Sequence, residues 1–126
     1  SVVYTNPEIA CIGLTEKDLN EIKEGDFAPS MSTDEPFVPY EVHKLPMTYS
    51  GRFVAENEGE TGLCKVIVDK RSKTIMGVHM IGNPCSEFVA AASFAVRMGY
   101  TVGEFKQVVF PHPTVGEVLR EVIAEL

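Results

Sequence analysis

Two runs of β-branched and other apolar residues in the middle of the chain constrain its fold most strongly. Residues 63–69 (LCKVIVD) and 74–81 (TIMGVHMI) each have the length of one strand and are rich in valine and isoleucine, which favour extended backbone. Residues 70–73 separate them and are all polar, so the pattern predicts an antiparallel hairpin with a tight turn. Because side chains alternate between faces, Val66 and Ile67 point to opposite sides. Both faces are therefore apolar, and we expect a central hairpin that is covered on each side.

The residues before the hairpin predict shorter elements and one long loop. Thr15 can cap a helix over residues 16–23, with Asp18 at the third position, where its negative charge suits the helix dipole. Three prolines within residues 26–39 favour an irregular connection, whereas residues 48–57 fit no single pattern. The expected strands are residues 1–4, 9–12 and 40–46, the last of them at an edge of the sheet.

The longest helix is expected after the hairpin. Asn83 is placed to cap it and Pro84 to occupy its first position, because proline lacks the N–H that would be unpaired there. The helix is predicted to run to Met98 and to end at Gly99, which can adopt the left-handed conformation. Its predicted apolar stripe is Phe88, Ala91, Ala92, Ala95 and Met98.

Two capping boxes follow the long helix. Thr101 with Glu104 predicts a short helix, and Thr114 with Glu117 predicts a last helix that ends near Glu125. Strands and helices in this order predict a single α+β domain over residues 1–126, with an antiparallel sheet flanked by helices. The predicted apolar stripe of the last helix is Val115, Val118, Leu119, Val122 and Ile123.

The composition argues against several classes of function. The net charge is −7 and the lysines and arginines form no cluster, which argues against binding to nucleic acid. No apolar run approaches the roughly 20 residues that span a bilayer, so we expect no membrane partner. Cys11, Cys64 and Cys85 are far apart and form no C-x-x-C pair, which predicts buried thiols in a reducing cytoplasm. The chain starts at Ser1 without a methionine or a signal sequence, which suggests a piece of a longer protein.

His112 is the leading candidate for chemistry. It lies between Pro111 and Pro113, which stiffen the backbone, and Glu117 follows five positions later. An imidazole can take or give a proton near pH 7, and a carboxylate can fix its tautomer and orientation. The alternative is structural, because a lone histidine beside a turn is usually a surface residue and Glu117 can simply complete a capping box. Spacing alone does not choose between the two.

The sequence supplies no partner for this base. His43 is interpreted as solvent-facing and His79 as a hydrogen-bonded residue of the sheet, and the three histidines are too scattered to bind a metal. The chain also lacks the G-x-G-x-x-G loop of dinucleotide sites and the G-x-S-x-G turn of serine hydrolases. We therefore expect the partner chemistry to lie in another part of a longer chain or in a second subunit.

Four segments together carry a family resemblance. They are residues 2–16 (VVYTNPEIACIGLTE), 76–82 (MGVHMIG), 95–99 (AVRMG) and the sequence His112-Pro113-Thr114 with Glu117. In this order they resemble the C-terminal dimerisation domain of the FAD-dependent pyridine nucleotide-disulfide oxidoreductases. The dihydrolipoamide dehydrogenase branch fits best, and glutathione reductases share much of the pattern. The chain departs from the family at residues 25–39, where most members use a shorter connection.

The resemblance implies a function. In this family a cysteine pair in the FAD domain exchanges with a dithiol or disulfide substrate, and electrons pass through the flavin to or from NAD(P). By resemblance, His112 is the acid/base that one subunit supplies to the thiol site of the other, and Glu117 orients it. The backbone of His112 and Pro113 is then expected against the partner's flavin. The implied cofactors are FAD and NAD(P) in the full-length enzyme, with none bound to this fragment.

The resemblance also implies partners. We expect a homodimer, contacts with the FAD and NAD domains of the full chain, and a 2-oxo acid dehydrogenase or glycine-cleavage complex as a candidate further partner. The function implied is that of an NAD-dependent dihydrolipoyl dehydrogenase, inactive as this fragment alone. Two alternatives stay open: the same domain of glutathione reductase or another disulfide reductase, or a purely structural dimerisation module.

Overall fold

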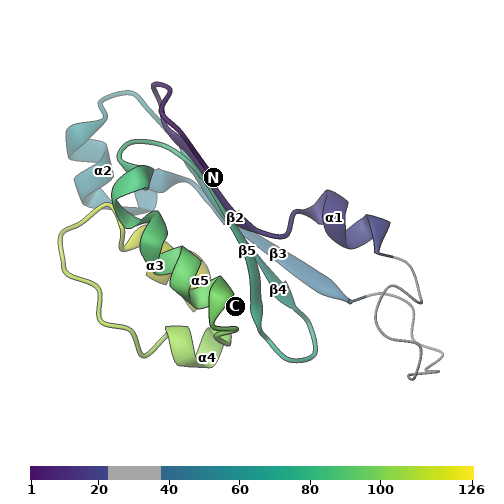
Figure 1. Ribbon diagram of the computed structural model, residues 1–126. Coiled ribbons are helices and arrows are strands. Elements are labelled where there is room, and N and C mark those ends of the chain that lie inside the picture. Colours follow the sequence, from purple (N-terminus) through teal and green to yellow (C-terminus); the bar gives the residue numbers. More distant parts are fainter. Residues whose placement is uncertain (23–37) are drawn as a thin grey trace, which may run out of the picture.

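The structure, a computed structural model, describes residues 1–22 and 38–126, and an antiparallel five-stranded sheet forms its centre (Figure 1). The strands lie in the order β1-β2-β5-β4-β3, so the predicted α+β class and the edge position of β3 are confirmed. The strands are β1 Val2–Val3, β2 Ile9–Gly13, β3 Tyr40–Leu45, β4 Leu63–Asp69 and β5 Ile75–Ile81.

Helices cover the two faces of the sheet unequally. The long helix α3 packs on β2 and β5, and the last helix α5 packs beside it on β3 and β4 (Figure 1). The short helix α1 lies on the opposite side of the sheet. None of the helices in the described part of the chain has the length and apolar character that a bilayer span requires. The helices are α1 Glu16–Glu21, the 3-10 turn η1 Met47–Tyr49, α2 Gly51–Glu56, α3 Cys85–Arg97, α4 Val102–Phe105 and α5 Val118–Ala124.

The hairpin that the sequence predicted is formed by β4 and β5. Val66 lies opposite Val78, and β5 is the middle strand of the sheet. The turn is closed by Asp69, whose carboxylate accepts hydrogen bonds from the N–H groups of Arg71 and Ser72 at 2.7 and 3.1 Å. A side-chain carboxylate that binds the backbone two residues on is a common way to tighten a turn.

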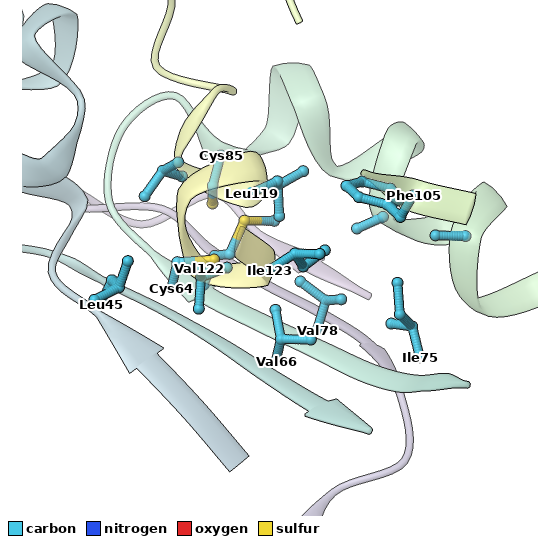
Figure 2. Close-up of a cluster of buried hydrophobic side chains, with 14 of the residues drawn as sticks. Leu45, Cys64, Val66, Ile75, Val78, Cys85, Phe105, Leu119, Val122 and Ile123 are labelled. Atoms are coloured by element: carbon cyan, nitrogen blue, oxygen red, sulfur yellow. The ribbon is translucent and has the colours of Figure 1, made fainter. Parts of the chain in front are cut away.

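The core lies between the sheet and the helices α3 and α5. Figure 2 shows side chains of β4 and β5, such as Val66 and Val78, directed toward Leu119, Val122 and Ile123 of α5. All five residues of the predicted stripe on the last helix are buried, so that prediction is confirmed. Burying one such aliphatic side chain contributes about 1.5–3 kcal/mol to folding, which makes α5 a strongly anchored element.

The other face of the sheet is covered only in part. Ile67 of β4 is fully buried, and so is Leu19 on α1, the helix that lies on that side. Farther along the same strands, Leu63 and Ile81 pair with each other and are both exposed. The expectation of a hairpin covered on each side is therefore correct only near α1.

Two helix starts follow the sequence pattern. Thr15 and Thr101 each accept a hydrogen bond from the N–H of the third helical residue, and the carboxylates of Asp18 and Glu104 bind back to the cap. Helix α1 ends at Glu21 and Ile22 is already extended, so the helix stops short of the expected residue 23. Most of the expected loop 26–39 lies outside the described residues. The ambiguous residues 48–57 form most of η1 and all of α2.

The start of α3 differs from the prediction. Asn83 does not cap the helix; its side-chain oxygen accepts from the N–H of Glu8 at 2.9 Å, and its amide donates to Asn6 at 2.8 Å. The Glu8 carboxylate instead accepts from the N–H of Ser86 at 2.9 Å. Glu8, which is distant in the sequence, thus supplies the hydrogen-bond acceptor that Asn83 was expected to provide at the start of α3. The other end agrees with the prediction, since Gly99 follows the helix with φ +67°, although Met98 is exposed.

We predict that Leu119→Ala destabilises the chain by about 2–5 kcal/mol, because Leu119 is fully buried and a cavity would replace it. Urea unfolding of the 126-residue chain measures this free energy. The matched control is Val109→Ala at an exposed position, which should change the value by no more than about 0.5 kcal/mol. Equal losses in the two variants would contradict the placement of α5 in the core.

We also predict that Gly77→Ala destabilises the chain by about 1–3 kcal/mol. A Cβ at this position would lie 2.1 Å from the carbonyl oxygen of Leu14, where β2 leaves the sheet, and a backbone atom cannot move aside easily. Gly51→Ala is the control, since nothing lies within 4 Å of its Cβ and alanine favours a helix. The midpoint of urea unfolding should fall in Gly77→Ala and should rise or stay unchanged in Gly51→Ala. Equal midpoints in the two variants would refute the close approach of Gly77 to the carbonyl of Leu14.

Candidate functional site

The His112 turn connects α4 to α5 on the helical side of the domain. Phe110 begins it and is held by the ring of Phe105, with ring centroids 5.6 Å apart. The peptide bond between His112 and Pro113 is cis, and both residues are exposed. The turn therefore has a half-buried start at Phe110 and an exposed tip that carries the imidazole.

His112 and Glu117 meet as a hydrogen-bonded pair. The Nδ1 atom of His112 lies 2.9 Å from Oε1 and 3.0 Å from Oε2 of Glu117. Because an ionised carboxylate can only accept, this contact assigns the proton of the neutral ring to Nδ1 and leaves a lone pair on Nε2. The side chain of His112 is 76% exposed and that of Glu117 only 8%. The pair thus reaches from the interior to the surface.

Glu117 is fixed from two directions. Its Oε2 also accepts the backbone N–H of Thr114 at 3.0 Å. Burial by itself would raise the pKa of this carboxyl, but it is outweighed by the hydrogen bonds from Thr114 and His112 and by the positive charges of Arg120 and of His112 in its protonated form. These hold the pKa below its ordinary value. Glu117 is therefore a carboxylate near neutral pH, as an orienting partner of an imidazole must be.

The capping box predicted at Thr114 is only half formed. Glu117 does bind the N–H of Thr114, but the hydroxyl of Thr114 donates to the carbonyl of Pro111 at 2.8 Å. Helix α5 accordingly starts at Val118, with Glu117 rather than Thr114 as its cap residue. The carbonyl of Pro111 competes successfully for the hydroxyl because the turn brings it close.

Sequence reasoning missed one residue at this site. Ser50, at the start of α2, donates its hydroxyl to the carbonyl of Thr114 at 2.8 Å and accepts the N–H of Phe53 at 3.2 Å. The local sequence indicates only that Ser50 can cap α2. Its bond to Thr114 spans 64 positions, so no local pattern predicts it.

A mostly apolar groove of about 630 Å³ runs beside the turn. It is lined by Phe88 of α3 and by Val109 and Pro113 of the connecting segment. Arg52 and Glu56 of α2 also line it and form an ion pair with each other. The groove gives the exposed tip an apolar neighbour that a second surface could fill.

The other candidates are structural. His79 is hydrogen-bonded through Nε2 to the carbonyl of Leu14 at 2.9 Å, as expected, whereas His43, which was expected to face the solvent, is half-buried on β3. Burial raises the pKa of Cys64 to about 12 and that of Cys85 to about 11, so neither is a thiolate near neutral pH. Within residues 1–22 and 38–126, no three histidine, cysteine or acidic side chains are grouped as metal ligands would be.

We predict that the stabilising effect of Glu117 depends on pH. A folded-state pKa below the ordinary 4.5 means that the carboxylate stabilises the fold above pH 4.5 and that this contribution is lost as the pH falls through the lower folded value. The difference in unfolding free energy between the unmodified chain and Glu117→Gln should therefore shrink with falling pH. Urea unfolding between neutral and acidic pH measures it.

The control for this series is Glu58→Gln, which changes an exposed carboxylate in the turn after α2. It should alter the free energy of unfolding by no more than about 0.5 kcal/mol at neutral pH. A difference between Glu117→Gln and the unmodified chain that stays constant over the whole pH range would show that the charge of Glu117 contributes nothing.

Comparison with known proteins gives relatives over the whole chain. Dihydrolipoyl dehydrogenase, mitochondrial, of Caenorhabditis elegans is 36% identical over 121 residues, which are 96% of this chain and 21% of that protein. Dihydrolipoyl dehydrogenase of Thermus scotoductus is 35% identical over 121 residues, 96% of this chain and 23% of that protein. The chain thus spans about a fifth of the length of these relatives.

Solved structures share the fold. LpdA from Mycobacterium tuberculosis superposes with a TM-score of 0.77 at 21% identity, over 99% of this chain and 24% of that one. The HOCl-induced flavoprotein disulfide reductase RclA from Escherichia coli gives 0.79 at 19% identity, over 98% of this chain and 25% of its own.

The family comparison covers nearly every residue. Residues 1–123 match the dimerisation domain of the pyridine nucleotide-disulphide oxidoreductases. The match includes the five strands, the long helix α3, all of α5 except its last residue, and the His112 turn, as the sequence resemblance implied. The chain therefore belongs to the pyridine nucleotide-disulphide oxidoreductase family, as its dimerisation domain.

Proposed function

We propose that this domain belongs to a homodimeric, flavin-dependent dihydrolipoyl dehydrogenase and that it supplies His112 as the acid/base of the partner subunit's dithiol–disulfide site. The family and the dihydrolipoyl dehydrogenases among its relatives support the class of enzyme. The single observation that carries the role of His112 is its geometry: Nδ1 is bound to a buried carboxylate while the side chain is 76% exposed.

The chemistry follows from the assigned tautomer. A substrate thiol that approached Nε2 would transfer its proton to the ring and become a thiolate, which is the reactive species in disulfide exchange. The imidazolium formed in this way would be stabilised by Glu117, which keeps the ring in one orientation throughout. In the reverse direction the same nitrogen returns the proton to the leaving sulfur.

The thiols of this reaction must come from elsewhere. Cys64 and Cys85 are buried with raised pKa values, and Cys11 lies on β2 opposite His79, so none of the three shares the exposed tip of the turn. Among the described residues His112 therefore has no sulfur partner in its own domain. A site shared between two subunits explains why a well-oriented base points away from its own fold.

FAD and NAD(P) are the cofactors that we propose for the full-length enzyme. The backbone of His112 and Pro113 fits a place against a flavin, because it is exposed and makes no hydrogen bond with any described residue. A bound flavin would carry electrons between the dithiol site and the nicotinamide. The residues of this chain would contribute the position of the turn and the lone pair of Nε2, which takes up and returns the thiol proton.

An exposed apolar stripe supports the homodimer. Phe94 and Met98 lie four positions apart on α3, and their exposed fractions are 68% and 65%. Side chains at this spacing share one face of a helix, and large exposed apolar residues that gather on one face favour an interface. This face of α3 is therefore the surface that we propose for the partner subunit, with the FAD and NAD domains of the full chain adjoining.

We propose the cytoplasm as the compartment, although the nematode relative is named as mitochondrial. A 2-oxo acid dehydrogenase or glycine-cleavage complex remains the proposed larger assembly.

The test is His112→Gln in the full-length homodimer. Glutamine can still hydrogen-bond but cannot accept the proton, so turnover with dihydrolipoamide and NAD⁺ should fall by about 10²-fold or more. The control is His43→Gln on β3, which should leave turnover within about twofold, since His43 lies in a strand and not in the His112 turn. Unchanged turnover of a His112→Gln enzyme that is still dimeric would refute the proposed role.

A further inference from the structure

The position of His112 depends on a residue from a distant part of the chain. We propose that Ser50 is a positioning residue for the His112–Glu117 pair and that it acts through the peptide group of Thr114. This inference rests on the proposed function of His112. It goes beyond that function because the hydroxyl of Ser50 makes no hydrogen bond with either member of the pair; it bonds to Thr114 and Phe53.

Ser50 is fully buried and uses its hydroxyl twice. The hydroxyl proton goes to the carbonyl of Thr114 at 2.8 Å, and the oxygen accepts the N–H of Phe53 at 3.2 Å. A buried polar atom that loses its partner keeps the cost of its lost hydration, which applies fully to the N–H of Phe53 and in part to the half-buried carbonyl of Thr114. The first bond joins the start of α2 to the connection between His112 and α5.

Thr114 is the point at which this connection acts on the pair. Its carbonyl accepts from Ser50, its N–H donates to Oε2 of Glu117 at 3.0 Å, and its hydroxyl donates to the carbonyl of Pro111 at 2.8 Å. All the polar groups of this residue are thus engaged. Because Thr114 follows the His112–Pro113 unit and binds Glu117, a rotation of its peptide group would change the distance between the two members of the pair.

A purely structural role for Ser50 makes a different prediction. If the residue only caps α2, its loss should lower stability and the amount of folded enzyme but not the turnover of each folded dimer. Thr101 offers the comparison, since it caps α4 with a hydroxyl that accepts the N–H of Glu104 and whose hydrogen bonds reach no residue of the His112 turn. The two roles therefore separate in kinetics per folded dimer.

The experiment uses the full-length homodimer with three variants, Ser50→Ala, Thr101→Ala and His112→Gln, and the double variant Ser50→Ala/His112→Gln. Misplacing a catalytic group by a fraction of an ångström to one ångström costs roughly ten- to a hundredfold in rate. Ser50→Ala should therefore lower kcat for dihydrolipoamide oxidation about tenfold or more per dimer. Its KM should stay within about twofold, since Ser50 acts on orientation and not on substrate binding.

The double variant shows whether Ser50 acts through His112. In the His112→Gln background the change Ser50→Ala should cost no more than about twofold, because residues that act as one unit are not additive. Thr101→Ala should lower the midpoint of thermal unfolding but leave kcat per dimer unchanged. If Ser50→Ala does not form dimers, Ser50→Cys carries the test, because it nearly keeps the volume and weakens the hydrogen bond to Thr114.

The outcomes separate this inference from the function on which it rests. A His112→Gln enzyme with full turnover would overturn the proposed function. A large loss in His112→Gln together with unchanged kcat in the Ser50 variant would overturn only the role of Ser50. A Ser50→Ala effect of equal size in both backgrounds would do the same, since it would show that Ser50 does not act through His112.

Discussion

The buried carboxylate of Glu117 is the constraint on which the candidate site depends. It accepts the N–H of Thr114 and faces Nδ1 of His112, so one side chain fixes both the backbone of the turn and the ring at its tip. Its own position is given by α5, whose first residues Val118 and Leu119 are fully buried beside it. The packed core thereby holds the exposed imidazole of His112 in one orientation, through the hydrogen-bonded carboxylate of Glu117.

The sheet explains why that anchor is firm. Helix α5 lies on β3 and β4, and β4 pairs on both sides, so the helix rests on strands that cannot shift without breaking neighbouring ladders. Helix α3 packs beside it with an outer face that carries Phe94 and Met98. The same helical layer thus places the turn and the apolar surface on one side of the domain, whereas α1 lies on the other (Figure 1).

Sequence reasoning succeeded where the deciding interactions are local. The capping boxes at Thr15 and Thr101 and the contact of His112 with Glu117 each join residues no more than five positions apart. It failed where a distant group competes or contributes. Asn83 binds the backbone 75 positions away instead of capping α3, and the link from Ser50 to Thr114 spans 64 positions. Local patterns of residue type indicate propensities, but they do not show which distant polar group will form a hydrogen bond with a given side chain.

The unequal exposure of the pair has a consequence for its surroundings. Dissolved ions can approach the imidazole of His112, but they scarcely reach the carboxylate of Glu117, since buried charges are screened much less than exposed ones. The direction in which the ring points is therefore insulated from changes in ionic strength. The Nε2 atom of His112 has no such protection, because it lies on the exposed side of the ring. A surface that covered the turn and the groove beside it would determine how much water and salt reach Nε2. This chain thus fixes the orientation of the ring, whereas the exposure of Nε2 to water depends on what lies against the turn.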